Sequence, residues 1–389
     1  MPNPVETDIL DGHFIHREGS PLPQLETKGG ARLAQPETKK SPLKKVGFAL
    51  YIILVILSAI IVGTYLIWNL LVKPPEINND PPAASSIQAP EIPADTSTTD
   101  TSTPPEDTST PTEPVPTRRD GVYTFALLGS DKASGNTDTI IVVTYDTVEQ
   151  TVGMVSIPRD TAVNRSWAKY PKINHAYSQG PDVLKQEIEN TFGIPIDYYI
   201  HINLSGFITL VNKLGGVDVY IPEDMNYDDP YQDLHIHYTK GQWHLNGQQA
   251  MEVARFRDNN DGTGYTDEGR AAMQRQMLVN LAKKVLSWNS LTKVLDFVDI
   301  FNTYVKTDLS VTDMAWFATQ AINVDLSTGL KQGSLEGRSD SYYKGHSWCY
   351  TYKAEDILPT LNEILNPYDM DLTAEDLDLP KASGYYFKY

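Results

Sequence analysis

The segment EVARFRDNNDGTGYTDEGRAAMQRQ, residues 252–276, has the residue types that most clearly point to chemistry. It carries Arg255, Arg257, Arg270 and Arg275, although the whole chain has a formal net charge of -18. A planar guanidinium binds a carboxylate or a phosphate through two parallel hydrogen bonds, so arginine is the usual side chain for such anions. The competing interpretation is a solvated helix face whose arginines pair with the acidic residues of the same segment.

The spacing of these polar residues predicts which of them can act together. Arg270 and Gln274 are four residues apart on a predicted helix, so they share one face and can bind one ligand. Arg255 and Arg257 are two residues apart, and such side chains point the same way only on extended chain. If both arginines serve one site, the helix before them must end near Ala254.

Two aspartates flank neighbouring predicted strands. Asp131 follows the strand at 123–129, and Asp138 precedes the strand at 139–146. If these strands pair, the two carboxylates come close together and suit Mg2+, with Mn2+ as an alternative, because both ions bind carboxylate and phosphate oxygens. Each aspartate alone is also an ordinary turn residue.

A further arginine follows the third predicted strand. The motif SIPRDT places Arg159 and Asp160 on the loop after that strand, and a rigid strand end commonly positions a functional loop residue. An ion-paired loop without a chemical role is the alternative interpretation.

The motifs that the sequence lacks narrow the chemistry. It has no G-x-S-x-G elbow, no P-loop and no G-x-G-x-x-G. Cys349 lies within a predicted apolar strand, and HIHY (235–238) is expected to be a strand face rather than a zinc site. Carboxylates and guanidiniums without a covalent catalyst suit direct displacement at phosphorus, which depends on positioning and on neutralising charge.

The pattern of apolar residues predicts a mixed α/β domain, with a central mixed sheet flanked by helices on both faces. We expect one domain over 119–370, followed by a tail over 371–389. Apolar and β-branched runs predict strands at 123–129, 139–146, 150–158, 197–204, 217–221 and 347–352. Caps and apolar periodicity predict helices at 180–193, 205–216, 246–256, 268–288, 294–304, 311–324 and 354–365.

A membrane anchor is predicted ahead of this domain. Residues 46–72 carry no charge and are long enough to cross a bilayer as one helix, which favours an uncleaved signal anchor. Four lysines come just before this stretch and one just after it, so residues 1–45 are expected to be a disordered cytoplasmic tail and the rest extracellular. Residues 73–118, rich in Pro, Thr, Ser and acidic side chains, predict an extended spacer. The acidic balance argues against nucleic-acid binding.

Taken in order, the motifs resemble those of the LytR-CpsA-Psr proteins of bacterial cell envelopes. The resemblance covers most of residues 121–285, and the predicted tail, single span and external domain also fit it. The matching stretches are LLGSD, TDTIIVV, SIPRDT, KINHAY, IDYYIHINLSGFITLVNKLGGVDVYIP, KGQWHLNGQQAMEVARFR and DEGRAAMQRQ.

This resemblance implies a fold, an activity and a set of site residues. The fold is a central sheet flanked by helices. The activity is the transfer of a phosphoglycopolymer, such as teichoic acid or capsule, from a polyprenyl pyrophosphate carrier to peptidoglycan. Asp131 and Asp138 correspond to the aspartates on the Mg2+ side. The residues that correspond to the pyrophosphate binders are Arg159, Arg255, Arg257, Arg270 and Gln274.

The sequence departs from the family pattern at three places. Val163 and Met273 stand where arginine is common, and GNT replaces a basic residue before Asp138. Arg165 is a candidate to substitute for the arginine missing at Val163. These departures make the expected phosphate site less cationic than usual.

The expected mechanism follows from the same resemblance. Arg159, Arg255 and Mg2+ neutralise the pyrophosphate, and Asp131 is the preferred base for a sugar hydroxyl that attacks the phosphorus. The helices at 205–215 and 268–288 are candidate walls of a groove for the lipid chain, although their apolar stripes also fit an ordinary core. A non-catalytic membrane receptor that binds a lipid-linked polymer and a polyprenyl-pyrophosphate hydrolase stay open as alternatives.

The lysines before residue 46 yield a prediction about topology. Protease added to intact, wall-stripped cells should digest the chain after Lys73 and spare residues 1–45, because the lysines hold the N-terminus inside. Antibodies against each part would detect the fragments on a blot. Protection of the part after Lys73 would contradict the extracellular placement and the class of substrate that depends on it.

Overall fold

The computed structural model describes residues 72–77, 116–130, 136–165, 169–286 and 303–387, with positions 55, 58, 62 and 301. The elements named below all belong to the unit Leu66–Tyr389. Among these described residues, no helix has the length and apolarity needed to cross a membrane. Several predicted segments lie outside the described residues. They are the tail at 1–45, nearly all of the span at 46–72 and of the spacer at 73–118, and most of the helix at 294–304.

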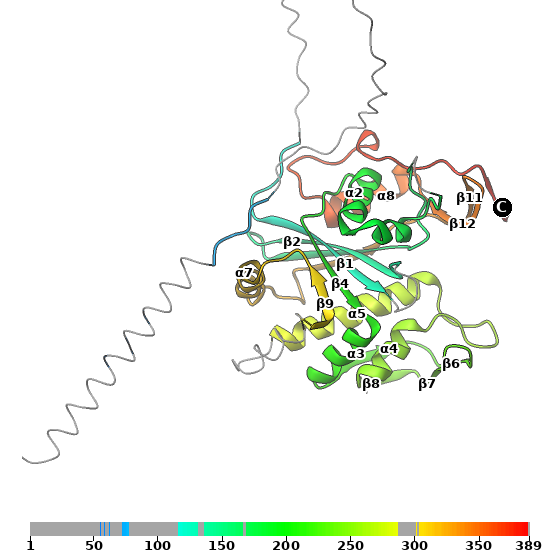
Figure 1. Cartoon of the computed structure of the whole chain (residues 1–389), viewed down its shortest axis with the longest axis horizontal. Coiled ribbons are helices and arrows are strands. Elements are labelled where there is room, and N and C mark those ends of the chain that lie inside the picture. The colour runs from blue at the N-terminus through cyan, green and yellow to red at the C-terminus, as the bar shows by residue number, and fades with distance from the viewer. Residues whose placement is uncertain are drawn as a thin grey trace, which may run out of the picture. The chain divides into compact units, whose positions relative to one another are not determined.

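A six-stranded sheet forms the centre of the fold, in the order β10-β3-β2-β1-β4-β9 (Figure 1). β1 pairs antiparallel with β2 and parallel with β4, and β3 pairs parallel with β10. The sheet is therefore mixed, as the sequence predicts. Its strands are β1 Val122–Ser130, β2 Thr139–Asp146, β3 Thr151–Ile157, β4 Tyr198–Asn203, β9 Val305–Thr307 and β10 Leu330–Ser334.

Helices cover both faces of this sheet because its strands are apolar on both sides. Along β1, Ala126 and Leu128 pack with α2 and α8, whereas Tyr123 and Phe125 pack with α7. Val279 of α5 packs against β2 and β3. The helices are α2 Pro181–Phe192, α5 Asp267–Leu286, α7 Val311–Ala321 and α8 Ala354–Thr360, with helical turns at Ile173–Gln179 and Leu361–Leu365.

A second hydrophobic core lies between α5 and a group of short elements on the side of α5 away from the sheet (Figure 1). Met273, Met277 and Leu281 are the buried residues that α5 contributes to it. The other elements are α3 Leu204–Lys213, α4 Gly247–Arg255, the pair β5 Val217–Ile221 and β8 Gly241–Leu245, and the pair β6 Met225–Asp229 and β7 Leu234–Tyr238. Because α5 packs against the sheet through Val279 and against this group through the second core, it fixes the sheet and this group against each other.

Three more strands form a small sheet near the C-terminus. They are β11 Arg338–Tyr343, β12 His346–Thr351 and β13 Gly384–Tyr385. Leu372 and Leu377 join the core that Ala126 and Leu128 form with α2 and α8, so residues beyond 370 pack on the same unit.

Local sequence explains where the elements around the site begin and end. The side chain of Asn203 accepts a hydrogen bond from the N–H of Gly206 and caps α3. Asn246 and Gln249 form a capping box at the start of α4. β1 and β2 pair with Gly129 opposite Thr139, so the end of β1 and the start of β2 lie side by side. Polar residues at these two strand ends therefore meet at one edge of the sheet.

Candidate functional site

A polar cavity of about 450 Å3 opens at this edge. Residues from the start of β2, the end of β3, the start of α5, and β12 line it. The predicted site residues that it brings together are Asp138, Arg159, Arg257, Arg270 and Gln274. The acidic side chains Asp160, Asp267 and Glu268 line the same cavity.

Asp138 and Arg159 form an ion pair at the mouth of the cavity. The N–H of Asp138 donates to the carbonyl of Gly129 at 2.8 Å, which fixes Asp138 at the start of the β1–β2 ladder. Arg159 Nη1 donates to Asp138 Oδ1 at 2.9 Å, and the two side chains are 44% and 39% exposed. Burial lowers the pKa of Arg159, but the carboxylates of Asp160 and Asp138 outweigh this effect and raise it. Arg159 therefore stays charged while still facing solvent.

Arg270 carries its charge in a less favourable setting. Its side chain is only 26% exposed and pairs with Asp267 at 3.1 Å. Burial lowers the pKa of Arg270; Asp267 opposes this shift, and the positive charges of Arg257 and Arg159 add to it. An anion bound between these three arginines would relieve their repulsion, which is the property expected of a phosphate site.

Gln274 lies one turn after Arg270 on the same face of α5, as the spacing predicts. Its Nε2 donates to the carbonyl of Ala254 at 3.0 Å. Its Oε1 accepts from Thr139 Oγ1 at 3.3 Å. Gln274 therefore ties α5 to the end of α4 and to the start of β2, which are the elements that carry the neighbouring site residues.

Arg255 and Arg257 lie on opposite sides of a helix end. α4 ends at Arg255, one residue from the predicted end, and Phe256 has extended backbone with φ -58° and ψ 135°. Phe256 is buried, so the chain is held at that point. Arg257 lines the polar cavity and lies 3.5 Å from Asp267, whereas Arg255 donates to Gln232 and lines an adjoining groove. The two arginines therefore line two adjoining depressions rather than one cavity.

The adjoining groove has a volume of about 480 Å3 and is mainly apolar. It shares Asp138, Thr139, Arg159, Arg270 and Gln274 with the polar cavity. Beyond these residues, α3 and α5 form walls, as the sequence suggested for the helices at 205–215 and 268–288. The apolar side chains of these walls include Phe207, Leu210, Met277, Leu278 and Leu281. A charged end and an apolar end therefore belong to one continuous depression.

Other predicted residues have different outcomes. Asp131 lies outside the described residues, so its metal and base roles stay predictions. Arg165 is buried and pairs with Glu187 at 3.6 Å, and it is not among the described residues that line either cavity. Burial raises the pKa of Glu187 to about 7. The suggestion that Arg165 replaces an arginine at Val163 is therefore wrong, because the Arg165 side chain points into the domain.

Arg275 is a buried residue that holds two of the residues lining the polar cavity. It is 6% exposed, donates to Ser156 Oγ at 2.8 Å and pairs with Glu268 at 2.9 Å. Both of these partners line the polar cavity. The sequence places Arg275 among the clustered arginines but does not indicate this role, because Ser156 is distant along the chain.

Two further features at the site were not predicted. Trp348 of β12 lines the polar cavity, is 46% exposed and has a positive φ of 56°. Ser130, at the end of β1, lies with its Oγ 2.8 Å from His201 Nε2. Burial, with a smaller effect of Lys306, lowers the pKa of His201 to about 4, so this histidine is neutral at physiological pH. The position of Trp348 and the contact of Ser130 with His201 both depend on strands far apart in the sequence, and no motif indicates them.

Comparison with known proteins agrees with this fold. The model of the LytR_cpsA_psr family matches residues 92–365. The chain therefore belongs to the LytR-CpsA-Psr family.

Individual relatives carry the names of transferases. The chain is 35% identical over 256 residues to the polyisoprenyl-teichoic acid–peptidoglycan teichoic acid transferase TagV of Bacillus subtilis (strain 168), covering 63% of each chain. It is 38% identical over 193 residues to TagU of Bacillus anthracis (strain CDC 684 / NRRL 3495), covering 48% of this chain and 61% of that one. The match thus spans about three fifths of these relatives' length. The crystal structure of Bacillus subtilis TagV has a TM-score of 0.54 and 28% identity, and the match covers 64% of this chain and 98% of that chain.

The setting of Arg270 yields a prediction that separates binding from stability. Arg270→Met should lower the affinity for inorganic pyrophosphate about ten- to a hundredfold, through loss of one charge-assisted contact. It should leave the free energy of unfolding unchanged or raise it, because burial and two other arginines oppose the Arg270 charge. Calorimetric titration and denaturant unfolding measure the two effects.

Arg119→Met is the matched control. Arg119 also pairs with an aspartate, Asp146, at 3.0 Å, and it is 41% exposed. It does not line the polar cavity. This variant should keep its pyrophosphate affinity and lose about 1 kcal/mol of stability. Normal pyrophosphate binding by Arg270→Met would contradict this prediction and would favour the alternative that the arginine cluster is an ion-paired surface.

Proposed function

We propose that the chain is a phosphotransferase that moves a phosphoglycopolymer from a polyprenyl pyrophosphate carrier to peptidoglycan. One observation carries this proposal: the charged cavity, which contains three arginines, and the apolar groove share five residues and so form one amphipathic site. A polyprenyl pyrophosphate has a doubly charged headgroup joined directly to a long apolar chain, and it matches both ends. The names of the relatives TagV and TagU support the same class of reaction.

The arginines and Gln274 bind and orient the headgroup. Arg159, Arg257 and Arg270 surround the cavity and neutralise the phosphates, and Gln274 fixes the register between headgroup and lipid chain. Arg255, on the groove side, contacts the phosphate nearer the lipid chain. Charge stabilisation by groups already held in place is the main contribution available to this reaction, because the site relies on no covalent catalyst.

The displacement proceeds in one step. The oxygen of an acceptor sugar hydroxyl forms a bond to the phosphorus that carries the glycopolymer. The bond from this phosphorus to the bridging oxygen breaks, and polyprenyl phosphate leaves with the electron pair. The hydroxyl proton passes to a carboxylate, for which Asp131 is the first candidate and Asp138 the second.

The donor set fits a hard cation. Asp138 lies beside the arginines that hold the headgroup, and Asp160 lines the same cavity. Mg2+ commonly takes one or two carboxylates and completes its shell with phosphate oxygens and water. When bound, Mg2+ would neutralise charge that develops on the phosphate oxygens, and Asp131 and Asp138 would hold it. Mn2+ would fit the same oxygens.

Trp348 offers a place for a sugar ring. Its indole is half-exposed at the rim of the polar cavity, on the side formed by β12. An aromatic face there can pack against the apolar face of a sugar of the donor or of the acceptor. The sugar would then lie beside the phosphates, while the lipid chain leaves along α5 in the other direction.

We also propose that residues 46–72 anchor the protein in the cell membrane, with the domain outside and residues 73–118 as a spacer. The lipid-linked donor lies in the membrane with its headgroup at the surface, and the peptidoglycan acceptor lies outside. An anchored external domain can reach both substrates.

Transfer itself is tested with a lipid-linked donor, a glycan acceptor and Mg2+, and mass spectrometry detects the phosphodiester product. The full-length protein should form this product only when the glycan is present. Release of the headgroup without a glycan would identify a hydrolase instead. Binding of the donor with no chemical change would identify a receptor.

The aspartates should separate catalysis from binding. Asp138→Asn and Asp131→Asn should each retain most lipid binding and lose transfer by at least about a hundredfold, the size expected for one charge-stabilising group. Asp218→Asn is the control, because Asp218 is 67% exposed on β5 and pairs only with His244 among the ion pairs of the described residues. Near-normal transfer by both site variants would remove these aspartates from the metal and base roles.

A further inference from the structure

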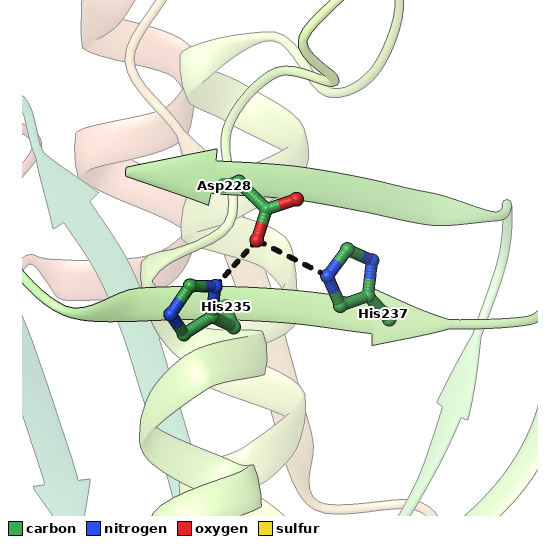
Figure 2. A group of neighbouring side chains, drawn as sticks. All are labelled: Asp228, His235 and His237. Atoms are coloured by element: carbon green, nitrogen blue, oxygen red, sulfur yellow. Dashed lines mark hydrogen bonds and ion pairs between the residues drawn. The ribbon is translucent and has the colours of Figure 1, made fainter. Parts of the chain in front are cut away.

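The hairpin formed by β6 and β7 presents a polar face to solvent. Along β7, the alternation of the strand buries Leu234 and Ile236 in the second core and exposes His235 and His237. In the ladder, Asp228 of β6 stands directly opposite His235. Two histidines and one aspartate therefore share one exposed face (Figure 2).

The three side chains converge on one point. His235 Nδ1 lies 2.5 Å from Asp228 Oδ1, and His237 Nε2 lies 3.2 Å from the same oxygen (Figure 2). One ligand atom from each of the three residues lies within 4.8 Å of the others. Tetrahedral Zn2+, with bonds of about 2.0–2.2 Å, holds its ligand atoms roughly 3.4 Å apart, so small rotations of these exposed side chains suffice.

The outer nitrogen of His237 has a hydrogen-bond partner, because His237 Nδ1 lies 2.9 Å from Asn226 Oδ1. The outer nitrogen of His235 lies 3.6 Å from Asp233 Oδ1, which is beyond hydrogen-bond distance. A ring nitrogen that donates its proton outward leaves the other ring nitrogen with a lone pair facing inward. For His237 this outer support is the usual setting of a metal-binding histidine, because it fixes both the tautomer and the ring orientation.

The inward-facing atoms need positive charge between them. When the two inward-facing ring nitrogens carry no proton, their lone pairs and a carboxylate oxygen face one another and repel. A proton or a metal ion at the centre removes this repulsion.

We propose that Asp228, His235 and His237 bind a divalent transition-metal ion, Zn2+ by preference, which revises the expectation that HIHY (235–238) is a strand face rather than a zinc site. Two imidazole nitrogens and one carboxylate oxygen suit Zn2+ far better than Mg2+, which prefers oxygen ligands alone. Three protein ligands leave a fourth position for water or another donor. This site is separate from the Mg2+ proposed at Asp138, because it lies on the hairpin rather than in the polar cavity.

The hairpin's contacts give such an ion a place in the architecture. Gln232, in the turn between β6 and β7, accepts a hydrogen bond from Arg255. The N–H groups of Asn226 and Asp228 donate to the side chains of Asn259 and Asn260, in the loop that follows Arg257. An ion that joins β6 to β7 would therefore stabilise the hairpin, which contacts both Arg255 and the loop that follows Arg257.

The test is a calorimetric titration of the full-length protein with ZnCl2 after treatment with a chelator. The wild type should bind Zn2+ with one equivalent that His235→Ala and His237→Ala each weaken at least about tenfold. His244→Ala is the matched control. His244 is 58% exposed and lies 2.7 Å from Asp218, but no second histidine joins it in the clusters of the described residues that could hold a metal.

His13 and His16 contribute the same background in every variant, so only the difference between variants counts. Visible absorption of the wild type with Co2+ gives a second readout, because a tetrahedral site containing histidine produces characteristic bands and needs no variant to fold. Equal Zn2+ affinity in the wild type and both site variants would overturn the proposal. Absence of Zn2+ binding and of Co2+ bands in the wild type would also overturn it, and the cluster would then be an ion pair only.

Discussion

The partial burial of a charged Arg270 beside two other arginines, at one edge of the sheet, is the constraint on which the site depends. Arg270 is held partly buried beside Arg159 and Arg257, and Asp267 offsets this only in part. Such an arrangement costs stability, so other contacts must fix it. Arg275 provides one of them, since it joins α5 to Ser156 of β3 from beneath the cavity. In the proposed function, this charge would be preorganised for an anion, because the protein would not have to rearrange when phosphate binds.

One helix connects this charge to the apolar groove. On α5, Arg270 and Gln274 face the shared region, and Met277, Leu278 and Leu281 follow along the groove. The intervals of three and four residues keep all of them on one side of the helix. The order along α5 is thus cation, amide and hydrocarbon, which is the order of a pyrophosphate joined to a polyprenyl chain. The two hydrophobic cores hold α5 from both sides and so fix this alignment.

Local patterns predicted much of the fold and part of the site. The shared helix face of Arg270 and Gln274 follows from helix periodicity. The end of α4 near Arg255 follows from the condition that two side chains two residues apart point the same way only on extended chain. Contacts across the sheet could not be predicted in this way. Trp348 reaches the cavity through the packing of β12, and Asp228 joins two histidines only through the register of β6 and β7. Arg165 illustrates the converse, because its spacing suggested the site but its burial beside Glu187 places it in the domain interior.

The most direct test of the account is a crystal structure of the domain with a short-chain polyprenyl pyrophosphate bound. The account predicts that the phosphates contact Arg159, Arg270 and Gln274, and that the apolar chain follows α5 past Leu278 toward Leu281. A headgroup bound outside the polar cavity, or an apolar chain lying away from α5, would contradict the central claim that the cavity and the groove form one site for an amphiphile.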